Sequence, residues 1–170
     1  MQEIVTDAIV LDREPAGESD ARLFLYTRAR GSIAVRAIGA RKIVSKLSSH
    51  LEPGSSIRCR LVGNGGFHLA DALVSRRLPL TIERVRLFQF LRTVLLPNDF
   101  DECLWELLEQ EPPAHFRSVL SCIGFDPEHA HCFFCGAGKP PLFDTNDARF
   151  LCDECLPRAG ALIAERLVRW

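Results

Sequence analysis

Four cysteines near the C-terminal end constrain the fold of this chain more than any other feature. They form two Cys-x2-Cys pairs, Cys132 with Cys135 and Cys152 with Cys155, separated by sixteen residues. Each two-residue spacing lets two sulfurs converge from one tight turn, and two such turns can enclose a single Zn²⁺. The pattern therefore predicts a zinc ribbon at about residues 130–157. Because four thiolates leave no position open for water, the zinc is expected to be structural.

Two disulfides or a redox-active Cys-x2-Cys motif are the alternatives to a metal site. The N-terminal residues lack the basic start and apolar stretch of a signal peptide, and no run of about eighteen apolar residues could span a bilayer. We therefore expect a cytoplasmic protein with reduced thiols, which favours the metal site. The other three cysteines, Cys59, Cys103 and Cys122, are expected to be small buried or half-buried residues without a reactive role.

Length and charge indicate two small lobes. A chain of 170 residues that is 47% hydrophobic can bury a core, but it is short for two self-sufficient domains of ordinary size. The net charge is −1, yet residues 1–80 carry an excess of basic side chains and residues 81–131 an excess of acidic ones. This segregation indicates two surfaces with different partners. We expect one domain at 1–78 and a second at 79–170.

Alternation of apolar and polar residues predicts that the first domain is built from strands. The five predicted strands span 3–12, 20–29, 32–38, 56–62 and 67–74, with glycine- and proline-containing turns between them. A short helical segment is predicted at 40–51. Five strands with a helical insert between the third and fourth are typical of the OB-fold barrel, which often holds single-stranded nucleic acid.

The second domain has a helical period. A helix is predicted between Pro79 and Pro97, with Val85, Phe88, Leu91 and Leu95 on one face. A second helix is predicted from a cap at Asn98 or Asp99 to about Gln110, a third at about 114–123, and a last one at about 157–169. The chain is therefore expected to be α+β, with a helical domain that carries the zinc ribbon.

Motifs of the first domain resemble the N-terminal domain of the bacterial RecO family. These motifs are Gly17-Glu18-Ser19-Asp20, Gly39-Ala40-Arg41-Lys42, Ser45-Lys46-Leu47 and Leu51-Glu52-Pro53. The order of domains is also similar, because RecO proteins place a helical domain with a zinc-binding insertion after an OB-fold. One departure is Ile38, where the family commonly has a lysine.

The resemblance implies a recombination mediator without enzymatic activity. Such a protein binds single- and double-stranded DNA, anneals complementary strands, contacts single-stranded-DNA-binding protein through that protein's C-terminal tail and, with a RecR-like partner, helps to load the recombinase. It would be associated with the nucleoid. For the partner tail, the expected contact is a groove with basic edges near Arg84, Arg86 and Arg92.

Basic residues of the first domain independently suggest a nucleic-acid surface. Arg41, Lys42 and Lys46 form a basic run with interleaved serines that suits phosphate oxygens, although a solvated helical face is the alternative. Arg22, Arg28 and Arg36 are expected to assist. On the second strand, Phe24 and Tyr26 share a face with Arg22 and Arg28. The two rings either stack on bases from an outer face or belong to the core or to an interface between lobes.

Catalytic motifs are missing from the sequence. It has no phosphate-binding loop, nucleophile elbow or His-Glu-x-x-His motif. One group of acidic residues consists of Asp99, Asp101, Glu102 and Glu106. Such a group could bind Mg²⁺ in a nuclease, but acidic side chains are also favoured at the start of a helix, where these residues lie. We expect no enzyme, and keep as an alternative function a zinc-ribbon adaptor that docks proteins and has lost its DNA role.

Overall fold

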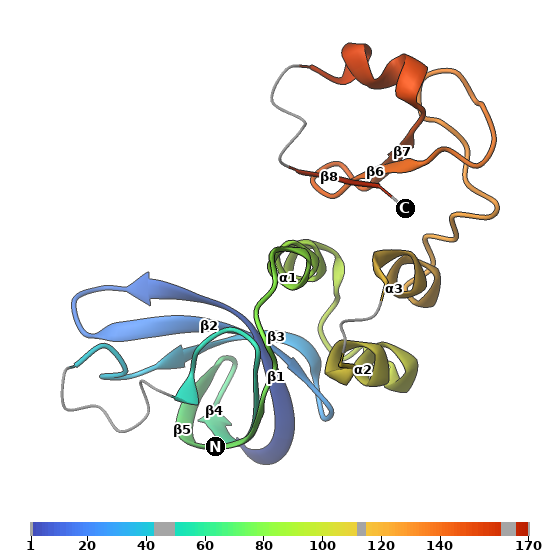
Figure 1. Cartoon of the computed structure of the whole chain (residues 1–170). Helices are drawn as coiled ribbons and strands as arrows, with labels where there is room; N and C mark the ends of the chain where they lie inside the picture. The colour runs from blue at the N-terminus through green and yellow to red at the C-terminus, as the bar shows by residue number, and fades with distance from the viewer. Residues whose placement is uncertain (1, 43–49, 112–114, 161–165, 170) are drawn as a thin grey trace. The chain divides into compact units, whose positions relative to one another are not determined.

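The computed structural model describes residues 2–42, 50–111, 115–160 and 166–169 (Figure 1). The chain divides into two compact units, Met1–Asp101 and Glu102–Trp170. The predicted domain boundary after residue 78 lies just after the last strand of the first unit. The first helix, which was expected in the second domain, instead belongs to the same compact unit as the strands. Each unit is described separately below.

Five strands of the first unit form a closed barrel in the order β1-β2-β3-β5-β4. Their bounds are β1 Gln2–Ala16, β2 Asp20–Thr27, β3 Gly31–Ala37, β4 Ser55–Gly63 and β5 Phe67–Arg77. The long strand β1 pairs with β4 through its first half and with β2 through its second half, with a bulge between Val10 and Asp12. Such a bulge bends the strand around the barrel. A parallel contact between β3 and β5 closes the ring.

The core of the barrel consists of apolar side chains from alternate positions of the strands. Its fully buried members include Ala8, Val10, Leu23, Leu25, Ile57 and Leu61. Since successive residues of a strand point to opposite faces, this pattern leaves the intervening polar residues outside. The five predicted strands are confirmed, and β1 and β5 are longer than expected. The helix predicted at 40–51 lies largely outside the described residues.

A single carboxylate joins two loops at one end of the barrel. Asp20, the first residue of β2, accepts a hydrogen bond from the backbone N–H of Gly39 at 2.7 Å. It also accepts one from Nε of Arg36 at 2.8 Å. The backbone N–H of Arg41 donates to the carbonyl of Ser19 at 2.8 Å. The turn between β1 and β2 is thereby tied to the loop that follows β3.

Helix α1, Ile82–Val94, packs on β1. Thr81 caps its start, because the Thr81 side chain accepts a hydrogen bond from the backbone N–H of Arg84 at 3.2 Å. Of the four residues expected on its buried face, Phe88 and Leu91 are buried, but Val85 is 38% exposed. Leu87 and Phe90 are buried in addition, so the buried face is rotated relative to the prediction.

Two short helices, α2 Glu102–Glu109 and α3 Phe116–Cys122, begin the second unit. Both are shorter than predicted. The cap predicted at Asn98 or Asp99 is wrong, because α2 begins only at Glu102. Asn98 has a φ of 61°, and its backbone N–H donates to the carbonyl of Arg30. A residue that caps a helix start normally has extended backbone angles. In the described residues, no helix is both long enough and apolar enough to span a membrane.

A small antiparallel sheet completes the second unit, in the order β7-β6-β8. Its strands are β6 Leu142–Asp144, β7 Arg149–Leu151 and β8 Leu167–Arg169, and a 3₁₀ helix spans Asp153–Ala159. The helix predicted at 157–169 is therefore wrong at its C-terminal end, where the chain pairs with β6. Short apolar runs cannot be assigned from periodicity alone, and pairing with β6 satisfies the backbone of β8.

Replacing Asp20 with Ala is expected to loosen the loop after β3 while the barrel stays folded. Hydrogen bonds from Gly39 and then Arg36 lower the pKa of Asp20, so the stabilisation is present near neutral pH and is lost as the pH falls through this lowered pKa. Hydrogen exchange should show the Gly39 and Arg41 amides exchanging on the order of tenfold faster at neutral pH. Asp7→Ala, which removes a carboxylate on another side of the barrel, is the control. Unchanged exchange in Asp20→Ala would contradict the assignment.

Candidate functional site

A pocket of about 530 Å³ opens on the barrel where two turns flank β2 and β3. Its lining residues are Ala16, Gly17, Arg22, Ala34, Val35, Arg36, Gly66 and Phe67. They come from the β1–β2 turn, from Arg22 of β2, from residues 34–36 of β3, and from the β4–β5 turn. The parallel pairing of Arg36 with His68 brings the last of these turns against β3. The β4–β5 turn also depends on Gly63, because a side chain there would lie 1.8 Å from the carbonyl oxygen of Gly66.

Three of the predicted DNA-binding arginines gather around this end of the barrel. Arg22 and Arg36 line the pocket, and they occupy paired positions on β2 and β3. The Arg36 side chain remains 65% exposed although it forms an ion pair with Asp20 at 2.7 Å. Arg41 donates a hydrogen bond from its guanidinium to the carbonyl of Gly17 at 2.6 Å, which holds it beside the β1–β2 turn. Positive charge and an open pocket therefore coincide.

The other predicted DNA-binding residues are placed differently. Lys42 is exposed and follows Arg41 in the same loop, whereas Lys46 lies outside the described residues. Arg28 follows the far end of β2, about 20 Å along the strand from Arg22 at 3.3 Å per residue. Its guanidinium lies over the ring of Phe100, 5.5 Å from the ring centre. The structure thus separates Arg28 from the pocket.

The two aromatic residues of β2 do not line the pocket. Tyr26 is fully buried, and its hydroxyl accepts a hydrogen bond from the Asp101 N–H at 2.8 Å. The Arg92 guanidinium covers Phe24, with its central carbon 3.6 Å from the ring centre. The two rings were expected either to stack on bases or to belong to the core or an interface. The structure shows them packed within the first unit.

Phe67 is the aromatic residue that the sequence analysis missed. It lines the pocket and packs partly against the barrel core. The available signal was the glycine-rich turn at 63–66, which predicts a hairpin but not which side chain lies beside it. Only the pairing of β3 with β5 places Phe67 near Arg36.

The three arginines predicted to bind a protein partner do not form an exposed basic edge. Arg84 is only 2% exposed and donates a hydrogen bond to the carbonyl of Pro79 at 2.7 Å. Arg92 forms ion pairs with Asp12 and Glu14 at 2.5 and 2.6 Å. Arg86 is half-buried. For Arg84 and Arg92 the prediction is wrong, because their guanidinium groups bind a carbonyl and two carboxylates within the first unit.

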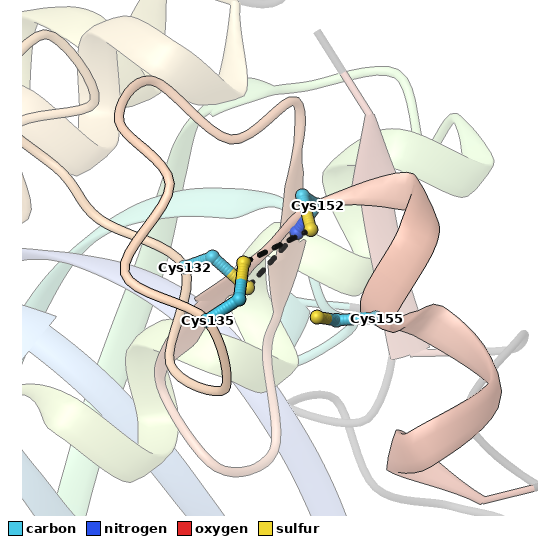
Figure 2. Close-up of side chains that lie close together, drawn as sticks. All are labelled: Cys132, Cys135, Cys152 and Cys155. Atoms are coloured by element: carbon cyan, nitrogen blue, oxygen red, sulfur yellow. Dashed lines mark hydrogen bonds between the residues drawn. The ribbon is translucent and has the colours of Figure 1, made fainter.

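The four cysteines converge in the second unit (Figure 2). Their sulfur atoms all lie within 4.8 Å of one another. The sulfurs of Cys135 and Cys152 are 3.6 Å apart, and the Cys152 backbone N–H donates to the Cys132 sulfur at 3.4 Å. A tetrahedral site with metal–sulfur distances of about 2.3 Å requires sulfurs about 3.8 Å apart. The cluster therefore fits one metal ion.

Local backbone geometry explains this convergence. The first pair lies in a turn closed by a hydrogen bond from the Gly136 N–H to the Cys132 carbonyl at 2.9 Å. Gly136 has a φ of 74°, a conformation that favours glycine. Cys152 follows β7 and Cys155 lies in the 3₁₀ helix, where its N–H donates to the Cys152 carbonyl at 3.2 Å. Two turns therefore present one pair of sulfurs each.

The cluster also has the electrostatics of a cation site. Burial by itself raises the pKa of Cys132, but backbone N–H donors, that of Cys152 first, outweigh it and lower the pKa to about 6. Burial and then the neighbouring thiols raise the pKa of Cys155 to about 12. Four thiolates so close together repel one another, so a cation is needed to hold all four deprotonated.

No comparable cluster of carboxylates exists in the part of the chain that the structure describes. The acidic residues considered for a nuclease, namely Asp99, Asp101, Glu102 and Glu106, do not supply three carboxylates to one group. Cys59 is buried in the barrel, where burial and then Asp7 raise its pKa to about 12. Cys122 is half-buried, but Cys103 is exposed, in contrast to the prediction.

Known proteins resemble this chain over both units. The family model described as "Recombination protein O N terminal" matches residues 1–73. A protein named DNA repair protein RecO from Myxococcus xanthus is 30% identical, over 96% of this chain and 77% of that protein. Another of the same name, from Bacillus velezensis, is 27% identical over 89% of this chain and 68% of its own length. One from Streptomyces griseus is 36% identical over 44% of this chain and 28% of its own length.

The two longer matches cover most of the second unit as well as the barrel. The likeness therefore extends over both units, as the N-terminal motifs together with the order of domains predicted. With its five-stranded first unit followed by helices, the chain belongs to the RecO family.

Proposed function

We propose that this protein acts in DNA repair and recombination by binding DNA with the pocket side of the barrel. The observation that carries the proposal is the position of that pocket, between the β1–β2 and β4–β5 turns and over β2 and β3. OB-folds bind oligonucleotides at this place. The strand order of the barrel supports its assignment as an OB-fold.

The chemistry of the pocket favours single-stranded DNA. Arg22 and Arg36 in the pocket, and Arg41 beside the β1–β2 turn, can contact phosphates regardless of sequence, while the Phe67 ring offers a face on which a base can stack. A volume of about 530 Å³ suits a group of the size of a nucleotide. The Asp20 carboxylate orients Arg36 and the loop of Arg41, so the cationic groups are held in place before DNA arrives.

The four-cysteine cluster is proposed to hold one structural Zn²⁺. Thiolate ligands and a tetrahedral arrangement suit zinc, and four protein ligands leave no site for a reacting water. The metal would link the turn of Cys132 to the turn of Cys152. Its role would be to stabilise the ribbon, and the protein as a whole would act through binding and not through catalysis.

Family membership supports a wider role. We extend the proposal to annealing of complementary strands, binding of double-stranded DNA, and help in loading the recombinase together with a RecR-like partner. Contact with the tail of single-stranded-DNA-binding protein is also proposed, but without Arg84 and Arg92, whose charges are committed to the fold. The alternative is an adaptor that docks proteins through the ribbon, where Phe133 is 65% exposed. Absence of DNA binding would favour that alternative.

Removing the pocket side chains is expected to weaken binding of a labelled single strand in a fluorescence anisotropy titration. Arg36→Ala should lower the affinity on every sequence, and Phe67→Leu should remove stacking worth roughly 1–3 kcal/mol while keeping an apolar contact with the core. Arg58→Ala is the matched control, because Arg58 is 64% exposed and ion-paired like Arg36 but lies on β4. Equal affinities for all four proteins would rule out the pocket as the DNA site.

The basic run after β3 is expected to determine how salt affects binding. If about four phosphates are contacted, the log–log salt slope should be roughly −3, at about 0.7 per phosphate. The combined replacement of Arg41, Lys42 and Lys46 by Ala should weaken binding on all sequences and flatten this slope, with little change in thermal stability. A triple variant with the affinity and slope of the parent would identify the run as a solvated face.

Elemental analysis of the purified protein is expected to find one zinc per chain. Cys135→Ser should lower the zinc content and loosen the ribbon, because the free energy of metal binding is part of the folding free energy of that unit. Cys103→Ser, which changes an exposed cysteine outside the cluster, should retain the metal. Zinc-free wild-type protein with four freely titrating ribbon thiols would contradict the proposal.

A further inference from the structure

A second pair of cysteines lies in the second unit, outside the metal cluster. Cys103 is in the first turn of α2, and Cys122 is the last residue of α3. Their sulfur atoms lie within 4.8 Å of each other, although 18 residues separate them in sequence. A disulfide needs sulfurs about 2.05 Å apart, and rotation about the Cα–Cβ bonds moves a sulfur by a distance of this order.

The two thiols differ in their access to solvent. Cys103 is exposed and Cys122 is half-buried. A small oxidant can therefore reach Cys103 directly, and Cys122 is the neighbour that can react with the oxidised sulfur next. Oxidation-sensitive sites commonly combine an accessible thiol with such a resolving thiol. Cys59, which is 2% exposed inside the barrel, has neither property.

We propose that Cys103 and Cys122 form a reversible disulfide when the protein meets hydrogen peroxide. The Cys103 thiolate attacks the O–O bond, takes one oxygen as sulfenic acid and releases the other as water after protonation. The Cys122 sulfur then attacks the Cys103 sulfur, which forms the S–S bond and releases a second water. Two thiols and one hydrogen peroxide thus give one disulfide and two waters, and a dithiol reductant reverses the change.

The bond would join two helices that are short by themselves. Helix α2 has 8 residues and α3 has 7. Isolated helices of this length are marginal in water, so their stability depends on tertiary contacts. A covalent link between α2 and α3 restricts the unfolded chain and stabilises their pairing. Oxidation is therefore expected to make this part of the second unit more resistant to opening.

Peptide mapping of the full chain tests the proposal. The zinc-loaded protein is treated with hydrogen peroxide, alkylated, and digested with trypsin and a protease that cleaves before aspartate. Cys103 is then carried by residues 101–117 and Cys122 by residues 118–125, away from all four ribbon cysteines. The expected product is a cross-link between these two peptides that dithiothreitol removes, with zinc retained. Backbone amides of α2 and α3 should also exchange more slowly in the oxidised protein under native conditions.

Single substitutions separate this route from general thiol damage. In Cys122→Ser, Cys103 should stop at sulfenic acid, which a dimedone probe labels. In Cys103→Ser, Cys122 should stay available for alkylation at the same peroxide dose. The proposal is overturned if wild-type Cys103 is converted to sulfinic acid or links two chains while Cys122 remains alkylated. Disulfides that form first among the ribbon cysteines, with release of zinc, would also overturn it.

Discussion

The parallel contact between β3 and β5 closes the barrel and thereby determines where the candidate site lies. It pairs Arg36 with His68 and so places the β4–β5 turn beside the outer face of β3. The β1–β2 turn reaches the same end of the barrel because β2 pairs with β3 throughout its length. A pocket lined by both turns follows from this closure. Residues that are about thirty positions apart in sequence become neighbours there.

Arginines of the first unit that pair with carboxylates differ in how much of the side chain remains exposed. Arg92 is bound by Asp12 and Glu14 and covers Phe24, so its charge stabilises the packing of α1 on β1. Arg36 is also paired, with Asp20, but most of its side chain remains exposed. A paired and exposed guanidinium keeps its orientation and can still meet a phosphate, because it offers five donors in a fixed plane.

The second unit combines an apolar core with the cluster of four cysteines. Its sheet strands have three residues each, and its buried apolar cluster includes Leu142 and Leu151. Strands this short form few ladder hydrogen bonds, so they need support from the turns beside them. The cysteine turns meet β6 and β7, where a bound metal would restrain both. Small units commonly require such a link when the core is limited.

Local sequence was sufficient to predict the strands of the barrel and the convergence of the four cysteines, and the sequence motifs were sufficient to predict the family. Period-two alternation depends on neighbouring residues, and the spacing of each cysteine pair already restricts both sulfurs to one turn. The same reasoning failed at 157–169, because a three-residue apolar strand and a helix end have similar local patterns. The role of Arg84 was misassigned for a related reason, since a charged residue gives no local sign that a carbonyl such as that of Pro79 will bind it.

The sequence by itself therefore determined the types of element and the chemistry available to the chain. Tertiary structure alone decided which of those groups meet. It buried Tyr26, separated Arg28 from Arg22, and brought Phe67 beside Arg36. The physical reason is that such meetings depend on strand pairing and ion pairs between residues far apart in sequence. These long-range contacts stabilise the protein only once the barrel has closed, and no local sequence pattern encodes them.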